Sequence, residues 1–185
     1  INFVGPSMTS MLTMGNKSNA IKTAQDNGVP VVPGSHGILT GAEQALDIAN
    51  SMGYPVLLKA VNGGGGKGIL VIEKAEDMFT GFAQVSAEAR SAFGNGDLYL
   101  EKYITSLRHI EVQLLRDKHC NTKVLGIRDC SVQRNNQKVV EESASTMLPA
   151  NLEAQALKHT AALADAVDYL GVGTVEFIYD LDQNA

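Results

Sequence analysis

The most informative part of the chain is a glycine-rich run, Lys59-Ala60-Val61-Asn62-Gly63-Gly64-Gly65-Gly66-Lys67-Gly68. Four consecutive glycines are unfavourable inside a helix or strand, because glycine loses the most conformational entropy on folding. Apolar stretches at 56–58 and 69–72 flank the run and predict a hairpin with the glycines at its tip. Bare backbone N–H groups beside lysine ammonium groups suit the phosphates of a nucleotide. The simpler interpretation is a flexible surface turn, since glycine clusters are common in turns.

The glycine run does not fit either of the two commonest phosphate-binding loops. A Walker A loop has the pattern Gly-x-x-x-x-Gly-Lys-Ser/Thr and leads into a helix. Here Lys67 precedes the second glycine of that spacing, and Ile69 begins another predicted strand. A dinucleotide fingerprint needs a helix directly after its glycines, and the pattern predicts a strand there instead. The sequence therefore predicts a phosphate-binding loop that belongs to a different fold.

Composition indicates a globular protein with one large or two small domains. The 185 residues are 44% hydrophobic and carry a net charge of −5 without a block of Lys and Arg, which argues against nucleic acid as a partner. The sequence has neither a signal peptide nor an apolar run of the roughly 20 residues that span a bilayer, so we expect a cytoplasmic protein without membrane contact. Cys120 and Cys130 lack the spacing of a zinc site, and we expect two free thiols.

Both ends of the chain predict a piece of a longer polypeptide. The chain begins with Ile1 rather than methionine, inside an apolar stretch that reads as the end of a strand. It stops at Ala185, in a predicted turn just after another strand. A natural protein seldom ends there, because an edge strand needs a partner.

Hydrophobic periodicity predicts an α+β fold with two lobes and a ligand cleft between them. The smaller lobe contains the hairpin, and its first helix is expected to begin with the capping box Thr40-Gly41-Ala42-Glu43 and to end at Gly53. The larger lobe reads as an antiparallel sheet with one covering helix, whose predicted inward residues are Ala156, Thr160, Leu163, Val167 and Leu170. The predicted helices cover 18–27, 42–52, 75–93 and 153–170, and the predicted strands cover 56–58, 69–72, 98–104, 108–116, 124–128, 138–142 and 173–180.

Polar and apolar residues alternate strictly in the stretch Arg108-His109-Ile110-Glu111-Val112-Gln113-Leu114. The apolar set is expected to face the core, which places His109, Glu111 and Gln113 on the opposite face of the strand. Such a row could line a nucleotide cleft, or it could be a solvated outer face. The preceding stretch Leu100-Glu101-Lys102-Tyr103-Ile104 reads as a hinge, whose extended backbone can offer a carbonyl and an N–H to the edge of an adenine.

Two further segments contain groups that could handle anions or cations. Glu176 interrupts an apolar strand, and burying a carboxylate is costly unless it is paired or bound to a cation such as Mg²⁺. The alternative is a surface glutamate at a sheet edge. Residues 133–142 combine two cations, two acids and four amides, a density that indicates anion handling. The Ser, Cys and His residues show no motif of a nucleophilic triad.

Taken in order and spacing, segments from the whole chain resemble the ATP-grasp biotin carboxylases. These are the ATP-dependent components of acetyl-CoA, propionyl-CoA, methylcrotonyl-CoA, pyruvate and urea carboxylases. Each segment alone is weakly informative, whereas together they are specific. The segments are Phe3-Val4-Gly5-Pro6, Met14-Gly15-Asn16-Lys17, Val31-Val32-Pro33-Gly34, Leu58-Lys59-Ala60 with the glycine run, Glu101-Lys102-Tyr103-Ile104, Arg108-His109-Ile110-Glu111-Val112-Gln113, Arg128-Asp129-Cys130-Ser131-Val132-Gln133-Arg134, Gln137-Lys138-Val139-Val140-Glu141-Glu142 and Gly173-Thr174-Val175-Glu176-Phe177.

The resemblance implies an ATP-grasp fold, of which this chain holds the central part. Residues 1–30 would be the end of the N-terminal biotin carboxylase domain and a linker, and residues 31–103 the lid lobe. Residues 104–185 would be the first half of the C-terminal lobe. The following segment, which carries the second magnesium glutamate and the catalytic base in the family, is absent from this sequence. We therefore expect this piece to be inactive alone.

The resemblance also implies which residues would bind the nucleotide. Lys17 and Lys59 would hold its phosphates, under a mobile loop made of Gly63, Gly64, Gly65, Gly66 and Gly68, in which Lys67 takes a position of arginine or lysine. Adenine would lie against the hinge, at Glu101, Lys102 and Ile104. Ribose or phosphate neighbours would be His109, Gln133 and Asn136. Asn136 stands where many members carry histidine, and an amide can still donate hydrogen bonds although it cannot become cationic.

Bicarbonate and metal would be bound in the second lobe. By resemblance, the catalytic Lys138 would help to hold bicarbonate, and Glu176 would be one of two glutamates that bind Mg²⁺ (or Mn²⁺). The implied reaction is ATP-dependent carboxylation of biotin with bicarbonate through carboxyphosphate, which gives ADP and phosphate. The implied partners are a biotin carboxyl carrier protein or domain, a carboxyltransferase and, for the intact protein, a second copy in a homodimer.

Three other interpretations stay open from the sequence. One is another bicarbonate-using ATP-grasp ligase, such as half of a carbamoyl-phosphate synthetase. The others are a non-catalytic nucleotide-binding domain and a purely structural fragment. Stimulation of turnover by biotin separates the first from a biotin carboxylase, and stabilisation by Mg-ATP separates the other two.

Overall fold

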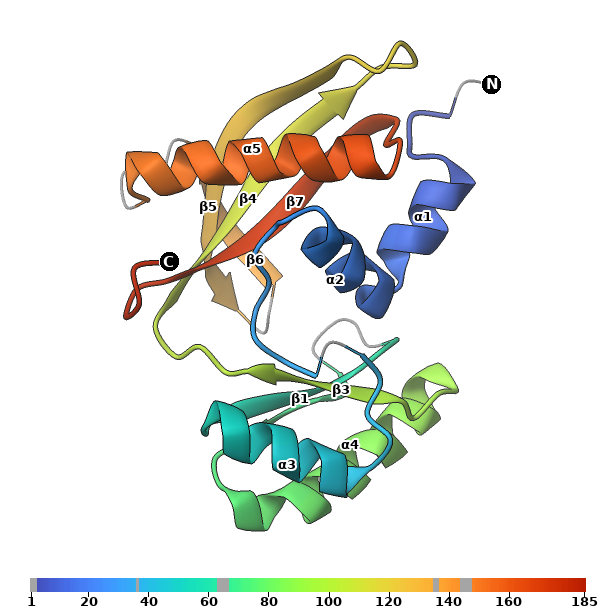
Figure 1. Cartoon of the computed structure of the whole chain (residues 1–185), viewed down its shortest axis with the longest axis vertical. Helices are drawn as coiled ribbons and strands as arrows, with labels where there is room; N and C mark the ends of the chain where they lie inside the picture. The colour runs from blue at the N-terminus through green and yellow to red at the C-terminus, as the bar shows by residue number, and fades with distance from the viewer. Residues whose placement is uncertain (1–2, 36, 63–66, 135–136, 144–147) are drawn as a thin grey trace. The chain divides into compact units, whose positions relative to one another are not determined.

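The computed structural model describes residues 3–35, 37–62, 67–134, 137–143 and 148–185. The chain falls into two compact units (Figure 1). The small unit comprises Asn16–Lys22 and Val31–Ile104, and the large unit comprises Ile1–Gly15, Thr23–Pro30 and Thr105–Ala185. Each unit has its own sheet and its own hydrophobic core.

The small unit is a three-stranded antiparallel sheet with two helices packed against it. Its strands are β1 (Val56–Ala60), β2 (Ile69–Ile72) and β3 (Leu98–Lys102), in the order β2-β1-β3. Helix α3 (Ala42–Met52) precedes β1, and the short 3-10 helix η1 (Ala75–Asp77) runs into α4 (Met78–Phe93) between β2 and β3. Strands β1 and β2 are antiparallel, with Leu58 opposite Leu70, so the predicted hairpin on either side of the glycine run is confirmed.

Alternation along the strands builds the core of the small unit. Val56 and Leu58 of β1 are fully buried, as is Leu100 of β3, because every second side chain points to the face that the helices cover. At Gly81 helix α4 lies so close to β2 that an added Cβ would stand 2.4 Å from Ile72 Cδ1. A larger residue at position 81 would therefore require the end of the Ile72 side chain to move.

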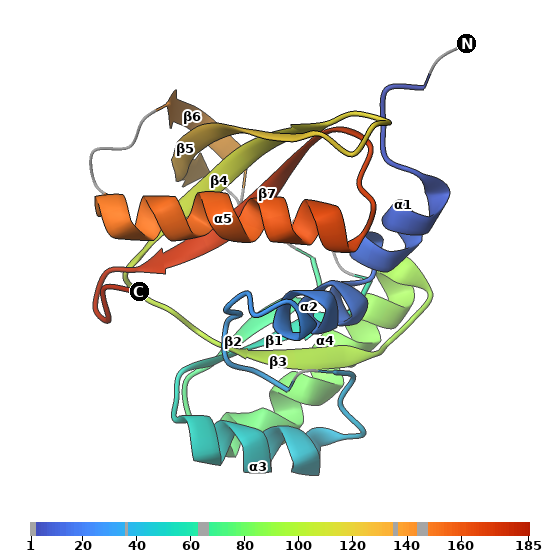
Figure 2. The same cartoon turned by 45° about the horizontal axis from the view of Figure 1, so that its top comes forward.

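The large unit is a four-stranded antiparallel sheet with one helix across it. The order of the strands is β6-β5-β4-β7. Helix α5 (Ala150–Ala166) covers one face (Figure 2), and its Ala156 joins the core with Ile110, Val112, Ile127 and Tyr179 of the sheet. Helix α1 (Met8–Gly15), which the sequence did not predict, precedes α2 (Lys17–Asp26) and α3 in the chain, and its Ser10 donates to Val167 O at 2.8 Å. The remaining elements are β4 (Leu107–Arg116), β5 (Thr122–Arg134), β6 (Gln137–Ser143) and β7 (Gly171–Asp180).

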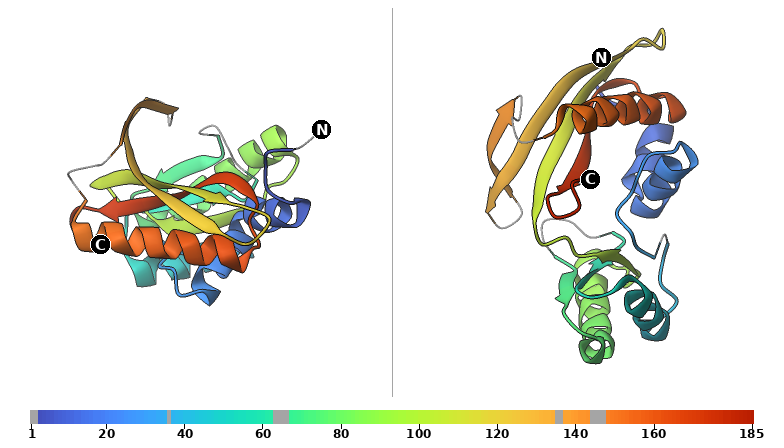
Figure 3. Two further views of the ribbon diagram at one scale, coloured as in Figure 1. Left: turned by 90° about the horizontal axis from the view of Figure 1, so that it is seen from above. Right: turned by 60° about the vertical axis from the view of Figure 1, so that its left-hand side comes forward.

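Two elements of the large unit differ from their predicted bounds. Strand β5 does not stop at Arg128 but continues to Arg134, and the pairing register with β6 shifts between Asp129 and Val132. Such irregularities bend a strand, and Figure 3 shows β5 curved along its length. Helix α5 ends at Ala166 instead of 170, because Asp168 takes a positive φ of 46°. Leu170 therefore lies outside the helix and is 38% exposed, so its predicted inward position is wrong.

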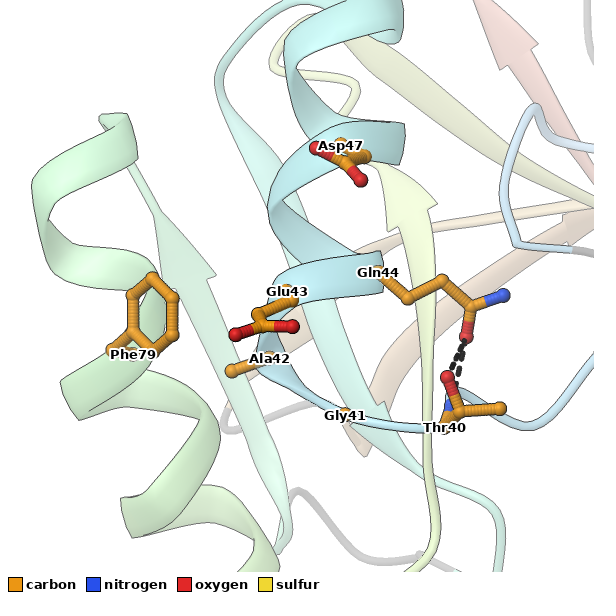
Figure 4. A pocket seen from close by; sticks show the side chains of 7 residues that line it. All are labelled: Thr40, Gly41, Ala42, Glu43, Gln44, Asp47 and Phe79. Carbon is orange, nitrogen blue, oxygen red and sulfur yellow. Dashed lines mark hydrogen bonds between the residues drawn. The ribbon is translucent and has the colours of Figure 1, made fainter.

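The beginning of α3 also differs from the prediction. Gly41 rather than Thr40 is the N-cap residue, and no side chain caps this helix. The Thr40 backbone N–H and hydroxyl both donate to Gln44 Oε1, at 2.7 and 3.0 Å (Figure 4). The capping box is therefore wrong, because Gln44, one residue beyond Glu43, makes the reciprocal contact. The predicted stop at Gly53 is confirmed, since its N–H donates to Ala49 O at 2.8 Å with a φ of 80°.

Two expectations from composition concern membrane spans and cysteines. Among the helices in the described part of the chain, none combines the length and the apolar character that a membrane crossing requires. Cys120 and Cys130 are both free, as predicted, the first exposed and the second buried. Burial and the nearby Glu111 carboxylate raise the pKa of the Cys130 thiol, so it stays protonated near neutral pH.

Candidate functional site

A polar row on β4 forms the centre of the candidate site. Ile110, Val112 and Leu114 are at most 2% exposed, as the alternation predicts. His109, Glu111 and Gln113 therefore lie on the opposite face of the sheet. Glu111 is only 3% exposed, so this row is not a solvated outer face. A carboxylate buried to this extent must be paired with cations or hydrogen-bond donors.

Glu111 receives those partners from the neighbouring strand β5 and from β6. In the pairing register it stands opposite Arg128 of β5 and opposite Glu176 of β7. Arg128 Nε donates to Glu111 Oε1 at 2.6 Å, and Lys138 Nζ of β6 donates to Glu111 Oε2. Each carboxylate oxygen thus has its own cation. Lys138 also donates to Glu176 Oε1 at 2.7 Å, so one ammonium group joins two carboxylates.

These contacts fix the charges of the cluster. Desolvation would raise the pKa of Glu111, but hydrogen bonds from Lys138 and Arg128 outweigh it and lower that pKa below its usual value. Contacts with His109 and Lys138 lower the pKa of Glu176 to about 2. For Lys138, desolvation is outweighed by the hydrogen bonds to Glu111 and Glu176, which raise its pKa. At neutral pH the cluster holds two carboxylates, a guanidinium and an ammonium group.

His109 is oriented by hydrogen bonds on its ring and on its backbone. Gln133 Nε2 lies 3.0 Å from His109 Nδ1 and donates also to Cys130 O at 2.9 Å. Because an amide nitrogen can only donate, Nδ1 accepts and the ring proton lies on Nε2. His109 Nε2 stands 3.4 Å from Glu176 Oε1. The His109 backbone N–H donates to Ser131 Oγ at 3.0 Å. His109 Nε2 therefore faces the Glu176 carboxylate without a well-aligned hydrogen bond to it.

The donor atoms of this cluster fit a divalent cation. Ligand atoms of His109, Glu111 and Glu176 lie within 4.8 Å of one another. Carboxylate oxygens such as those of Glu111 and Glu176 are the ligands that Mg²⁺ or Mn²⁺ prefers, whereas His109 Nε2, which carries the ring proton, offers no lone pair. Glu176 is the accessible member, with 56% of its side chain exposed against 4% for Glu111. A cation would meet Lys138 there, because its ammonium group contacts both carboxylates.

The structure brings together His109, Gln133, Lys138 and Glu176, four of the residues predicted for the site. It adds Arg128, which the sequence did not single out, and it brings into the cluster Glu111 and Gln113, which the sequence placed on the polar face without a specific role. Arg128 donates through Nη1 to Gln113 Oε1 at 2.9 Å as well as to Glu111. Alternation had placed Glu111 and Gln113 on the polar face, but only the strand register shows that Arg128 lies opposite them.

The small unit contains a second, simpler charge pair. Lys59 of β1 forms an ion pair with Glu101 of β3, and both side chains are mostly buried, with 23% and 15% of their surface exposed. The ammonium group also lies 5.9 Å from the centre of the Tyr99 ring. Lys59 and Glu101, both predicted to bind nucleotide, therefore lie side by side on the same sheet.

The hinge residues have specific partners within the small unit. Lys102 Nζ donates to Gly53 O at 2.9 Å and to Tyr54 O at 3.3 Å, where it covers the C-terminal end of α3. The Lys102 backbone N–H donates to Pro33 O at 2.8 Å. An adenine at this strand would therefore not use this N–H, and Ile104 lies two residues beyond the end of the strand.

The remaining predicted residues surround the glycine run. Gly68 is buried with a φ of 68°, and an added Cβ would stand 2.8 Å from Ala60 Cβ, so only glycine suits this position. Lys67 is exposed, and Lys17 begins α2. Gly63, Gly64, Gly65, Gly66 and Asn136 lie outside the described residues.

The small unit also has a surface hollow, and none of the residues that line it was predicted to bind a ligand. It is bordered by the beginning of α3 and by Phe79 of α4 (Figure 4). Its lining includes the carboxylates of Glu43 and Asp47, an arrangement that disfavours a phosphate because like charges repel. We therefore take the cluster around Glu111 as the candidate site of the large unit, and the Lys59–Glu101 pair as the candidate site of the small unit.

Comparison with known proteins agrees with the predicted resemblance. Residues 16–185 match the family model described as carbamoyl-phosphate synthase L chain, ATP binding domain. Biotin carboxylase 1 of Bacillus subtilis is 48% identical over 183 residues, which are 99% of this chain and 41% of that protein. The chain thus spans about two fifths of the length of this curated relative.

Solved structures give the same result. The biotin carboxylase of Campylobacter jejuni, in a beta-gamma-ATP complex, matches with a TM-score of 0.94 and 44% identity over 98% of this chain and 41% of that one. The biotin carboxylase domain dimer of Hydrogenobacter thermophilus 2-oxoglutarate carboxylase, in complex with MgADP, ADP and bicarbonate, matches with a TM-score of 0.93 and 44% identity over 98% and 40%. The predicted α+β fold and the resemblance to ATP-grasp biotin carboxylases are confirmed.

Proposed function

Because the chain belongs to the family of carbamoyl-phosphate synthase L chain ATP-binding domains, we propose that it is the ATP-binding part of a biotin carboxylase. Such an enzyme carboxylates biotin on a carrier protein, with bicarbonate as the carbon source and ATP as the energy source. Identity of 44 to 48% with biotin carboxylases along nearly the whole chain supports this choice of substrate.

In the proposed reaction, a bicarbonate oxygen attacks the γ-phosphorus of ATP. The bond from this phosphorus to the β–γ bridging oxygen breaks, which gives ADP and carboxyphosphate. Carboxyphosphate then separates into carbon dioxide and phosphate, and the ureido nitrogen of biotin attacks the carbon dioxide and loses its proton to the released phosphate. A magnesium ion, when bound, supplies positive charge that neutralises the phosphate oxygens during phosphoryl transfer.

The observation that carries the proposal is the cluster around Glu111. It holds the Lys138 ammonium group in one position and keeps it cationic, as the binding of an anion such as bicarbonate requires. It places Glu176, the proposed metal ligand, on the same ammonium group. His109 lies beside Glu176 and Gln133 contacts His109, and we assign both as neighbours of ribose or phosphate oxygens.

The nucleotide would be bound by residues of both lobes. We assign its phosphates to Lys17 and Lys59 and to the backbone of the glycine run, and its adenine to the hinge at 101–104. In this assignment residues 31–103 are the lid lobe, residues 104–185 begin the C-terminal lobe and residues 1–30 lead into them. Partners would be a biotin carboxyl carrier, a carboxyltransferase and a second copy of the intact chain.

The proposal is tested by following ADP release from the complete polypeptide that carries this chain. Release should require bicarbonate and should increase when free biotin is added, and Mg-ATP should raise the melting temperature. A ligand at 100 times its Kd stabilises a protein by about 2.7 kcal/mol. ADP release that biotin leaves unchanged would contradict the proposal.

A second candidate function is part of a carbamoyl-phosphate synthetase, which the family description supports. Both enzymes would phosphorylate bicarbonate, so the cluster around Lys138 suits either one. The same assay separates them, because ADP release that depends on ammonia and leads to carbamoyl phosphate would favour the second candidate.

A further inference from the structure

The Lys138 ammonium group contacts two carboxylates that differ sharply in their surroundings. Glu111 is buried, with 4% of its side chain exposed, whereas Glu176 is 56% exposed. Both accept a hydrogen bond from Lys138 Nζ. The same cation is thus held by one inner and one outer partner.

The inner partner cannot readily turn away from Lys138. Arg128 holds the other oxygen of Glu111, and Gln113 holds Arg128 through its Oε1 at 2.9 Å. Gln113 Nε2 in turn donates to Gly173 O of β7 at 2.7 Å. Rotation of the Glu111 carboxylate would leave a buried charge without its cations, which is strongly unfavourable.

The outer partner is the one that can be exchanged. Lys138 Nζ and His109 Nε2 both contact Glu176 Oε1, at 2.7 and 3.4 Å. A divalent cation bound at that oxygen would repel the ammonium group, since like charges a few ångströms apart repel each other. Cation binding to Glu176 and the Lys138–Glu176 ion pair therefore oppose one another.

We propose that Lys138 and a divalent cation compete for Glu176, and that Glu111 is the positioning residue that retains Lys138 when Glu176 turns to the cation. The inference rests on the proposed role of Glu176 as a metal ligand. It gives the two carboxylates separate tasks: Glu111 keeps the ammonium group in the site, and Glu176 exchanges the ammonium group for the metal.

Manganese binding to the complete polypeptide tests the competition directly, with Mn²⁺ as a probe whose free concentration is followed by electron paramagnetic resonance. Removing the ammonium group in Lys138→Met should tighten Mn²⁺ binding by about fivefold, the upper range for a half-exposed ion pair. Glu111→Gln should weaken Mn²⁺ binding, because Lys138 then relies on Glu176 alone. Glu111→Asp should restore most of the affinity, and thermal melts establish that each variant is folded.

A matched control separates positioning from loss of negative charge. Glu141 also faces Arg128, at 3.4 Å, and Glu141→Gln removes the same charge. It should change Mn²⁺ affinity by less than about twofold, as expected for an exposed pair. In a Lys138→Met background, Glu111→Gln should likewise have little further effect. An equal weakening by Glu111→Gln in both backgrounds would overturn the positioning role.

The remaining outcomes distinguish this inference from the proposed function. If Glu176→Gln abolishes Mn²⁺ binding but Lys138→Met leaves the affinity unchanged or lower, the competition is wrong and the metal role of Glu176 stands. If the unaltered protein binds no Mn²⁺, both the metal role and the competition are overturned. Tighter binding in Lys138→Met, lost again on further removal of Glu176, supports both.

Discussion

The two candidate sites hold their lysines in different ways, Lys138 by a network in the large unit and Lys59, among the described residues, by one ion pair and the Tyr99 ring in the small unit. Lys138 contacts two carboxylates, one of which is fixed by Arg128. Lys59 pairs with Glu101 on the same sheet. A network with a buried anchor fixes the position of a charge, whereas a single pair can open when a ligand offers a better partner. In the proposed function, Lys138 would then be preorganised and Lys59 would exchange Glu101 for the nucleotide.

The largest effect is expected from removing the preorganised cation. In the complete polypeptide, Lys138→Ala should lower kcat by about 10²- to 10³-fold, the range for loss of one charge-stabilising donor. The KM for ATP should change little, since Lys138 is assigned to bicarbonate. Steady-state ADP release at varied bicarbonate and ATP measures both. A variant with normal kcat and a raised KM for ATP would indicate that Lys138 binds the nucleotide. The contrast between the roles of Lys138 and Lys59 would then be wrong.

The next largest effect concerns the anchor of the network. Glu111→Ala leaves Arg128 and Lys138 without their shared carboxylate, and these side chains are 28% and 26% exposed. We expect a loss of about 2–3 kcal/mol in the free energy of unfolding, less than the roughly 3–5 kcal/mol for a fully buried pair. Glu141→Ala is the control, with a loss below about 1 kcal/mol because that pair is exposed. Denaturant unfolding measures both values. If Glu111→Ala and Glu141→Ala lowered the free energy of unfolding equally, Glu111 would stabilise the network no more than Glu141 does.

A smaller effect is expected at the exchangeable lysine. Lys59→Ala should raise the apparent KM for ATP by about tenfold, which corresponds to roughly 1.4 kcal/mol of binding. Its effect on kcat should be weaker than that of Lys138→Ala, because Lys59 is assigned to phosphate binding. The same kinetic assay at saturating bicarbonate provides the measurement. An unchanged dependence on ATP would contradict the assignment of Lys59.

The difference between the two regions also shows how far sequence reasoning reaches. Strict alternation predicted which face of β4 is polar, and the apolar stretches beside the glycine run predicted the β1–β2 hairpin. Arg128 could not be predicted as a partner of Glu111, because their contact depends on a strand register interrupted by a bulge after Gln113. Lys102 likewise covers α3 through a contact 49 residues away in the chain. The local sequence pattern thus predicted most of the helices and strands. The ion pairs depend on contacts between residues far apart in the chain, which the local pattern does not reveal.

The smallest effect should come from the partner of Lys59. Glu101→Gln removes the carboxylate of a single pair, so the free energy of unfolding should fall by only about 0.5–1 kcal/mol. The surface pair Lys74–Glu76 has its charged atoms 3.1 Å apart and side chains that are 63% and 77% exposed, so Glu76→Gln is the matched control with almost no change. Loss of Glu101 should also leave Lys59 free, so the KM for ATP should stay the same or fall. If Glu101→Gln destabilised the protein as much as Glu111→Ala, the small unit would hold its lysine as firmly as the large one, and release of Lys59 to the nucleotide would lose its basis.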